Sequence, residues 1–264
     1  MIIFKKYDTS IKGFVLFLTM SGLIACGTSE LRNSKIEGKK LPITSEYADT
    51  PEIETFIKPY RDHINKDLDS VLSYSPETLD KSKPIDKWQT AIGNLMADVT
   101  LEAADKVLFT REKRHADICL LNHGGIRAIL PKGDITTRTA FEIMPFENSL
   151  VVIALKGEQI REIADYLIKE KKPHPLAGME ILLDKDATMV KDITVEGKPL
   201  EIGKIYNVAT SDYLSNGGDN MEFFKRGIAT YDLDYKLRNV FIDYFKSTDT
   251  IYASKSLRVI TEKQ

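Results

Sequence analysis

Two pairs of glycines, each flanked by polar side chains, are the groups in this sequence whose types and spacing could do chemistry. The first pair lies in residues 122–127 (NHGGIR) and the second in residues 216–219 (NGGD). Glycine lets the backbone approach a ligand closely or adopt a positive φ. The guanidinium of Arg127 could grip a carboxylate or a base edge, and the carboxylate of Asp219 could accept from hydroxyls or amines. Each segment therefore either fixes a polar ligand or is a tight turn with the usual Asn, Gly and Asp.

Two aromatic residues occupy expected loop positions. Phe146 ends a Met-Pro-Phe segment ahead of an apolar run at residues 150–155, and Tyr213 comes just before the second glycine pair. A flat ring in a loop offers a stacking platform for a nucleobase, which in single-strand binders contributes ~1–3 kcal/mol per base. The alternative for each ring is packing in the core.

The elements that must position these loops are predicted from hydrophobic periodicity. Helices are predicted at residues 53–74, 90–104, 158–169 and 237–246, and strands at residues 117–122, 150–155, 179–183, 193–195, 205–210 and 257–261. The second glycine pair then falls in a loop at residues 212–219. Helices and strands mix without strict alternation, so the fold class is α/β or α+β, with sheets covered by helices.

Composition and charge exclude several classes of protein. The 264 residues carry 37 Lys and Arg against 39 Asp and Glu, for a formal charge of −2, and 42% are hydrophobic. This composition excludes a collagen-like or mostly disordered chain. It also lacks the excess of basic residues that gives nucleic-acid binders their affinity for phosphate, so nucleic acid is not an expected partner.

The amino terminus has the pattern of an export signal. Basic residues precede an uncharged, largely apolar run at residues 13–25, which is too short for a membrane span of ~20 residues. The run ends in Leu-Ile-Ala before Cys26, an arrangement that resembles the lipobox of bacterial lipoproteins. The resemblance implies a signal peptide at residues 1–25, a lipid on Cys26 and a flexible tether at residues 26–50. The alternative is a buried apolar helix with an incidental cysteine.

A lipid-anchored chain would lie in the bacterial cell envelope, with the outer membrane as the expected location. Acylation of Cys26 would leave Cys119 as the one remaining cysteine, so no disulfide within the chain is expected. Cys119 lies in the apolar run ICLL, where a buried and inert thiol is the expected state and a reactive one the alternative.

Four ordered motifs resemble the C-terminal domain of bacterial and animal 5′-nucleotidases. The segments are residues 121–127 (LNHGGIR), 133–148 (GDITTRTAFEIMPFEN), 150–157 (LVVIALKG) and 211–221 (SDYLSNGGDNM), and the likeness begins near the IGNL at residues 92–95. The resemblance implies one domain at residues 51–264, with a four-layer helix/sheet/sheet/helix arrangement that binds the nucleoside part of a nucleotide.

The resemblance also implies roles for six residues. Phe146 and Tyr213 would sandwich the base, and Asp219 would hold the ribose hydroxyls. The remaining three, Asn122, Gly124 and Arg127, would surround the base or ribose. This sequence departs from the family at Tyr213, where phenylalanine is usual, and at residues 86–90 (DKWQT), where the family tends to place Arg or Glu.

The catalytic half of such an enzyme is not expected in this chain. Complete 5′-nucleotidases have an N-terminal metallophosphoesterase domain with two metal ions, whose ligands come in Asp-x-His, Gly-Asn-His and His-x-His segments. The four histidines here show neither an Asp-x-His nor a His-x-His spacing, and His123 belongs to the nucleoside motif. About 65 residues separate Cys26 from the matched region, against ~150 for a separate domain. We therefore predict no catalytic residue, no metal ligand and no cofactor here, with divalent metals only in a partner metallophosphoesterase.

Three functions fit these observations. The chain is the substrate-binding half of a 5′-nucleotidase whose chemistry comes from a separate chain, or a non-enzymatic nucleoside or nucleotide binder at the cell surface, or a degenerate fold that serves as an interaction module. The two rings, Arg127 and Asp219 favour the first two functions over the third.

Overall fold

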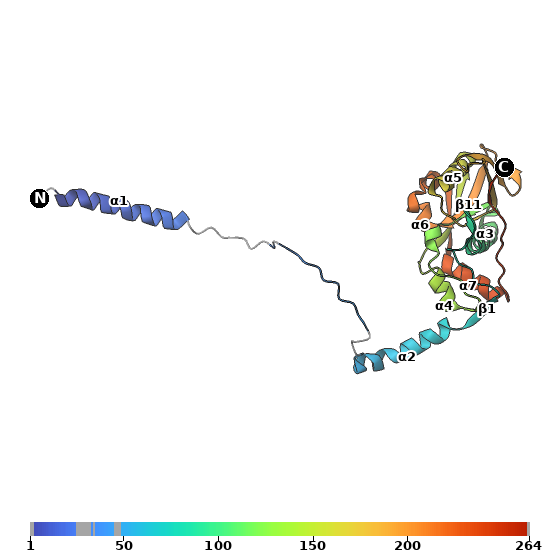
Figure 1. The fold of residues 1–264 in the computed structure, drawn as a ribbon, viewed down its shortest axis with the longest axis horizontal. Coiled ribbons are helices and arrows are strands. Elements are labelled where there is room, and N and C mark those ends of the chain that lie inside the picture. The colour runs from blue at the N-terminus through green and yellow to red at the C-terminus, as the bar shows by residue number, and fades with distance from the viewer. Residues whose placement is uncertain (1–2, 25–32, 34, 45–48, 263–264) are drawn as a thin grey trace. The chain divides into compact units, whose positions relative to one another are not determined.

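The computed structural model describes residues 3–24, 33, 35–44 and 49–262. The chain divides into two compact units, Met1–Ile53 and Glu54–Gln264, whose elements are labelled in Figure 1. The first unit contains helix α1 (Ile3–Ile24), which takes in most of the apolar run at residues 13–25. None of the helices within the described residues combines the length and the apolar character needed to cross a membrane. Cys26 lies outside the described residues, so its acylation stays a prediction.

The second unit is built around two larger sheets, beside which two further pairs of strands form. Its helices are α2 (Pro51–Leu68), α3 (Ala91–Glu112), α4 (Thr137–Ile143), α5 (Gly157–Glu170), α6 (Asp212–Ser215) and α7 (Leu237–Ser247). A five-stranded sheet has the order β12 (Ala229–Lys236), β6 (Ser149–Lys156), β11 (Ile205–Ser211), β4 (Ile118–Leu120), β7 (Leu176–Ala177). A four-stranded sheet has the order β10 (Lys198–Pro199), β9 (Val190–Val195), β8 (Met179–Leu183), β13 (Val259–Thr261). The mixed α/β class predicted from the sequence is confirmed.

Strand β6 shows why the five-stranded sheet is buried on both faces. Leu150 and Val152 point into one apolar core with helices α3, α4 and α7. Val151 and Ile153, one residue out of phase, point into a second core with α5 and the four-stranded sheet. Successive side chains of a strand point to opposite faces, so a continuous apolar run suits a strand covered on both sides. In the four-stranded sheet, β8 instead alternates buried and exposed residues, so only one of its faces lies in the core.

Local signals start and stop the long helix α3. The hydroxyl of Thr90 accepts a hydrogen bond from the backbone N–H of Gly93 at 3.0 Å, which caps the first turn. A Cβ at Gly93 would lie 2.8 Å from that hydroxyl oxygen, so glycine leaves room for the cap. The helix ends at Lys113, whose φ of 56° is left-handed.

Two predicted segments differ in kind from the structure, and other elements were not predicted. The helix predicted at residues 53–74 ends at Leu68, and Val71 begins strand β1 (Val71–Ser75), which pairs with β5 (Gly133–Thr136). The apolar period continues across this boundary because strand residues also bury a face. The predicted loop at residues 212–219 contains helix α6, because the Ser211 hydroxyl accepts from the backbone N–H of Leu214 and caps a short turn. Strand β12 lacks a recognisable pattern and was not predicted.

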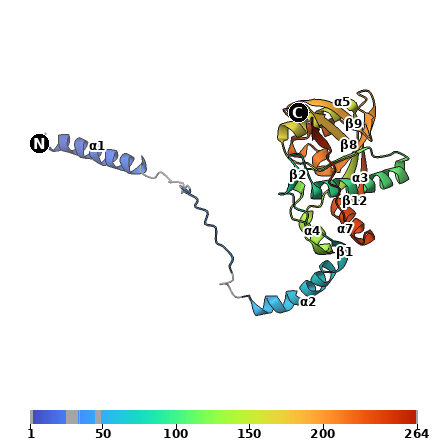
Figure 2. The same ribbon diagram turned by 45° about the vertical axis from the view of Figure 1, so that its right-hand side comes forward.

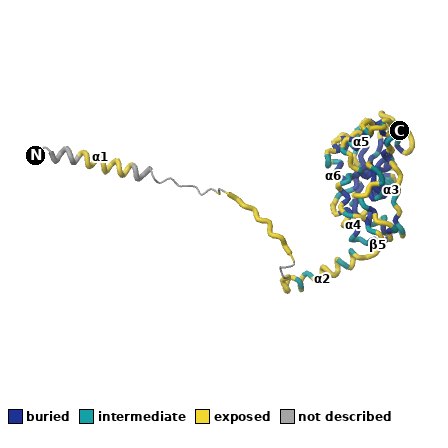
Figure 3. The backbone as a smooth tube through the Cα atoms, in the orientation of Figure 1, coloured by how far each residue is buried: buried dark blue, intermediate teal, exposed yellow. Residues whose placement is uncertain are grey.

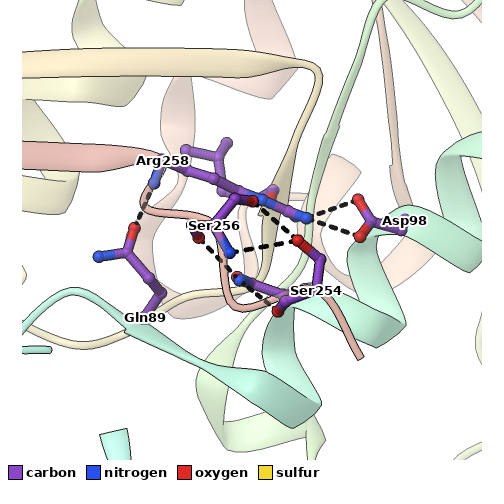
Figure 4. A network of polar contacts seen from close by, with 7 residues as sticks. Gln89, Asp98, Ser254, Ser256 and Arg258 are labelled. Atoms are coloured by element: carbon purple, nitrogen blue, oxygen red, sulfur yellow. Dashed lines mark hydrogen bonds and ion pairs between the residues drawn. The ribbon is translucent and has the colours of Figure 1, made fainter. Parts of the chain in front are cut away.

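A polar network fastens the C-terminal strand to the rest of the unit (Figure 4). The buried guanidinium of Arg258 donates to both carboxylate oxygens of Asp98, at 2.7 and 2.6 Å, and also to the carbonyl of Leu176. The side-chain oxygen of Gln89 accepts from the backbone N–H groups of Arg258 and Val259, at 2.6 and 2.8 Å. These bonds hold β13 beside β8 and against the start of α3.

Two short strands precede α3. They are β2 (Pro84–Asp86) and β3 (Gln89–Thr90), an antiparallel pair that brings Gln89 to the network above. Among the described residues of the N-terminal unit outside the helices, residues 33, 35–44, 49 and 50 form neither helix nor strand and are exposed.

Candidate functional site

Three loops meet at one edge of the five-stranded sheet. Strands β4 and β11 are parallel, so the residues that follow them, Asn122 and Asp212, emerge at the same edge. Strand β6 is antiparallel to β11, with Leu150 paired to Ser211, so the loop that carries Phe146 reaches this edge from the other direction. The sheet topology thereby gathers segments that are far apart in the sequence. Figure 2 shows the turned ribbon, in which helices α3, α4 and α7 lie together.

Asp219 joins the two glycine-pair segments. Its Oδ2 accepts from the side-chain amide of Asn122 at 2.7 Å, although the two residues are 97 positions apart. Its Oδ1 accepts from the phenol of Tyr213 at 3.0 Å. The carbonyl of Asp219 accepts from the phenol of Tyr166 at 2.8 Å. Burial, followed by the negative charge of Glu170, raises the pKa of Tyr166 to about 12, so this phenol stays a donor. Asp219 has a φ of 51°, a left-handed conformation that this network holds in place.

Arg127 and Phe146 form a second contact at the same edge. The Arg127 guanidinium carbon lies 5.8 Å from the centroid of the Phe146 ring, and its Nη1 donates to the carbonyl of Gly124 at 3.4 Å. A guanidinium at this distance from a ring is in cation–π range. The structure thus links the six predicted site residues in two clusters, with Gly124 contributing its backbone.

Both predicted stacking rings have exposed surface. Phe146 is 40% exposed and Tyr213 is 46% exposed, so the alternative in which these rings pack in the core is wrong. Tyr213 borders an open hollow of about 500 Å³. Its other lining residues are Asn148, Asp212, Asn216, Gly217 and Gly218. An exposed ring beside a hollow can receive a flat ligand without rearrangement of the core.

The fold itself requires glycine at both positions of the second pair, whether or not a ligand binds there. Gly217 has a φ of +85°, a conformation that side chains other than glycine rarely adopt. A Cβ at Gly218 would lie 2.5 Å from Cε1 and 2.6 Å from Cζ of Tyr213. The tight-turn alternative drawn from the sequence therefore applies to this glycine pair, and ligand binding by the segment stays a prediction.

Substitution Gly218→Ala should destabilise the protein, because the new methyl group overlaps the Tyr213 ring and backbone. Overpacking of this kind costs about 1–3 kcal/mol, and we expect a loss of this size in the free energy of unfolding measured by urea denaturation. Gly203→Ala is the matched control, since a Cβ there meets nothing within 4 Å. Equal stability of the two variants would contradict the close approach of Gly218 and Tyr213.

The structure adds three residues to the site that sequence reasoning missed. Lys81 donates from Nζ to the carbonyl of Ile126, inside the first glycine-pair segment. Burial and the positive charge of Arg127 lower the pKa of Lys81. Tyr166 holds Asp219, and His174 supports the turn at His123. No sequence motif surrounds these three residues. Their hydrogen-bond partners lie 45 to 53 residues away along the chain, so the sequence alone does not bring them together.

His174 is buried under the first glycine pair. Its Nδ1 accepts from the backbone N–H of His123 at 3.3 Å, which assigns the ring proton to Nε2. That Nε2 has no hydrogen-bond partner among the described residues, and the ring centroid lies 5.6 Å from that of Tyr166. Burial, with a smaller effect of His123, lowers the pKa of His174 from 6.5 to about 4.

This shift predicts a specific loss of stability in acid. The unfolded chain binds a proton at His174 below pH 6.5 and the folded chain only below about pH 4, so the unfolded state gains protons first as the pH falls. The free energy of unfolding should therefore drop between these two pH values, by about 3 kcal/mol for a shift of this size. His174→Asn keeps an acceptor for the N–H of His123 without titrating. Denaturation curves across this range should show a weaker pH dependence for the variant, and unchanged dependence would rule out His174 as its source.

The histidines, acidic residues and Cys119 that the structure describes do not gather into a metal site. Across the part of the chain that the structure describes, no group of three or more His, Cys, Asp or Glu residues could hold a metal ion. The Nδ1 of His123 lies 3.3 Å from the carbonyl of Pro173, to which it donates. Cys119 is free and buried, and burial raises the pKa of its thiol, as expected for an inert cysteine.

Comparison with known proteins identifies the domain. A model of the family described as 5′-nucleotidase, C-terminal domain matches residues 77–226. The chain belongs to this family. The resemblance predicted from the motifs is thus confirmed, and the six predicted site residues all lie within the matched region.

Relatives of the 5′-nucleotidase C-terminal domain come from bacteria and animals. The chain is 27% identical over 220 residues to the trifunctional nucleotide phosphoesterase protein YfkN of Bacillus subtilis, covering 78% of this chain and 15% of that protein. It is 22% identical over 246 residues to the 5′-nucleotidase of Homo sapiens, covering 84% of this chain and 42% of that protein.

Solved structures share the fold. The crystal structure of a 5′-nucleotidase precursor from Thermus thermophilus superposes with a TM-score of 0.66 at 23% identity, covering 80% of this chain and 43% of that chain. A putative 5′-nucleotidase from Staphylococcus aureus gives a TM-score of 0.62 at 16% identity, covering 84% of this chain and 46% of that chain. The chain therefore spans less than half the length of each of these relatives.

Proposed function

We propose that this chain binds the nucleoside part of a nucleotide and is the substrate-binding half of a 5′-nucleotidase-type phosphohydrolase. Membership of the 5′-nucleotidase C-terminal domain family supports a nucleotide-related function. The observation that carries the finer proposal is the pair of exposed rings, Phe146 and Tyr213, at one sheet edge with Arg127, Asn122 and Asp219. Rings supply stacking, and the polar groups supply orientation.

In the proposed binding mode the base lies between Phe146 and Tyr213, and Asp219 accepts from the ribose hydroxyls. A carboxylate offers about four lone-pair sites, and Asn122 and Tyr213 each occupy one. Acceptor capacity therefore remains for a ribose. The amide of Asn122, the backbone of Gly124 and the guanidinium of Arg127 would face the base or ribose from the other segment.

Hydrolysis of the phosphate ester is assigned to a separate metallophosphoesterase chain. Two bridging metals polarise the phosphoryl oxygens and generate the attacking hydroxide in such centres. The four histidines of this sequence lack the ligand spacing of such a centre. In the proposed pair, this chain would hold the nucleoside and orient the phosphate toward the metals of its partner.

Calorimetric titration of adenosine into the purified protein tests the binding proposal. We expect saturable binding of one adenosine per chain, and weaker binding of adenine than of adenosine if Asp219 holds the ribose. Asp219→Ala should remove most of that difference between the two ligands. Absence of adenosine binding would contradict the proposal. Binding without any gain in AMP hydrolysis when candidate metallophosphoesterases from the same cell envelope are added would favour a non-enzymatic binder.

Lys81 should distinguish nucleotides from nucleosides. Its ammonium lies on the turn that carries Arg127, so two cations are available on that side for a phosphate. Lys81→Met is expected to weaken AMP binding about tenfold, or ~1.4 kcal/mol, while adenosine binding changes little. Lys81→Arg should retain the AMP affinity, and Lys83→Met is a control for loss of a lysine from the same loop. Equal weakening of AMP and adenosine would indicate a purely structural role.

Lipid anchoring at Cys26 and a location in the cell envelope are part of the same proposal. The support is the apolar run at residues 13–25, which ends in Leu-Ile-Ala directly before Cys26 and whose residues up to Ile24 belong to helix α1. Multiple acyl chains on one residue give stable anchoring where one chain is marginal. Palmitate labelling should mark the wild-type protein and not Cys26→Ser, and the variant should leave the membrane fraction. Labelling of the variant would disprove this site.

A further inference from the structure

Helix α2 carries an exposed apolar stripe that the proposed nucleoside site does not use. Phe56, Tyr60 and Ile64 recur every four residues and are 70%, 64% and 55% exposed. Residues four apart lie on one face of a helix, and the rings of Phe56 and Tyr60 are in contact, with centroids 5.9 Å apart. None of the described residues of α2 is buried, and Figure 3 shows most of the helix in the colour of exposed residues.

The C-terminal end of α2 is nevertheless fastened to the domain. Arg138 on α4 donates to the carboxylate of Asp69 at 2.7 Å and to the side chain of Asn65 at 2.9 Å. These bonds fix the last turn, whereas the stripe residues stay more than half exposed. Helices in proteins gain most of their stability from the packing of an apolar face, so an amphipathic helix with its apolar face exposed is suited to a partner.

Helix α2 lies at the border of the region that this chain shares with its longer relatives. A match that covers 84% of 264 residues takes in about 222 of them, so at most about 42 residues lie outside it and α2 lies within it. The matched family is a C-terminal domain, and the human relative extends well beyond the match, since only 42% of it is covered. Helix α2 therefore lies where the shared domain borders the rest of its longer relatives.

We propose that the stripe of Phe56, Tyr60 and Ile64 is the docking surface for the separate metal-dependent phosphohydrolase chain. This inference rests on the proposed function and adds to it the surface by which the two chains associate. In the longer relatives the two parts belong to one continuous chain. Docking at α2 would join them here without a covalent link, and would hold the metal centre near the nucleoside site.

The charged residues of α2 favour a protein over a lipid membrane as the partner of the stripe. Helix α2 contains four acidic residues and three basic residues. Membrane-surface helices instead have polar faces rich in Lys and Arg. Several of these charges are also paired within the helix, such as Arg61 with Glu54 at 2.7 Å and Lys58 with Asp62 at 2.6 Å, which suits a face that stays in water while the apolar stripe is covered.

Site-specific photo-crosslinking in the native cell tests this docking surface. A benzophenone amino acid at position 56 or 60 should give one crosslinked product, and the same group at Asp62, on the opposite face, should give none. Mass spectrometry of the product should identify a chain with the ligand spacing of a two-metal phosphoesterase. A product formed from two copies of this chain, a lipid adduct, a different protein or the absence of a stripe-specific product would each overturn the proposal.

A paired substitution supplies the functional arm of the test. The full-length protein is captured from native envelope extracts, and AMP hydrolysis by the captured material is measured. Phe56→Ser with Tyr60→Ser should lower this hydrolysis at least tenfold, without changing adenosine binding. Tyr252→Ser is the matched control, because Tyr252 is an exposed ring outside α2.

Two outcomes of this arm separate the docking surface from the nucleoside site. Unchanged hydrolysis by the captured paired variant would overturn the docking surface. Absence of adenosine binding by the wild type would instead contradict the nucleoside site, and the crosslink would still report on the docking.

Discussion

Replacing Phe146 and Tyr213 together with alanine should weaken adenosine binding a hundredfold or more. Stacking contributes ~1–3 kcal/mol per ring in single-strand nucleic-acid binders, and both rings here are large apolar groups that face solvent at the sheet edge. Two such contributions, taken at the lower half of that range, give ~3 kcal/mol, or about two orders of magnitude in Kd. Calorimetry on the variant and the wild type measures the difference directly.

Controls separate stacking from other effects of these substitutions. Tyr252→Ala removes an exposed ring far from this edge in the sequence and should leave the affinity unchanged. Tyr213→Phe keeps the ring but loses the hydrogen bond to Asp219, which is 3.0 Å long, so a small loss is expected. If the double alanine variant bound adenosine like the wild type, these rings would not form the base site.

The second large effect is expected at Arg258, on stability rather than on binding. Arg258→Ala removes two charge-assisted hydrogen bonds to Asp98 and one to the carbonyl of Leu176 (Figure 4). Removal of one partner of a buried ion pair costs about 3–5 kcal/mol. The Asp98 side chain is 44% exposed, so water can partly replace its lost partner, and we expect the lower end of that range.

Urea denaturation followed by the fluorescence of Trp88 measures this loss. Trp88 is the single tryptophan of the sequence, is buried and lies next to Gln89 in the same network. Lys255→Ala is the control, because its ion pair with Glu77 at 2.9 Å is exposed and surface pairs contribute only about 0–1 kcal/mol. A loss at Arg258 no larger than that of the control would show that the network does not hold β13 in place.

Elements with a strong period were predictable from the sequence because one physical signal decided each of them. Strand β6 is a continuous apolar run buried on both faces, and α5 places its apolar residues on one face. The prediction failed where two signals competed. The apolar period of α2 runs into β1 across Asp69 and Ser70, and the sequence alone does not tell at which residue the helix ends.

The residues of the candidate site could be named from the sequence, but the contacts between them could not. The glycine pairs and the rings are local features, so Asn122, Arg127 and Tyr213 could be named from the sequence. The bond between Asn122 and Asp219 spans 97 positions and depends on β4 and β11 being parallel neighbours. Lys81 was missed for the same reason, since only the folded chain brings its ammonium to Ile126.

That this chain binds the nucleoside and lacks a catalytic centre of its own is tested most directly by one assay. The purified protein is incubated with AMP and Mn²⁺ or Zn²⁺, phosphate release is measured, and adenosine binding is measured on the same sample. We expect adenosine binding without phosphate release above that of the buffer. Phosphate release by this single chain that a chelator abolishes would contradict it, because the chain would then contain its own catalytic centre.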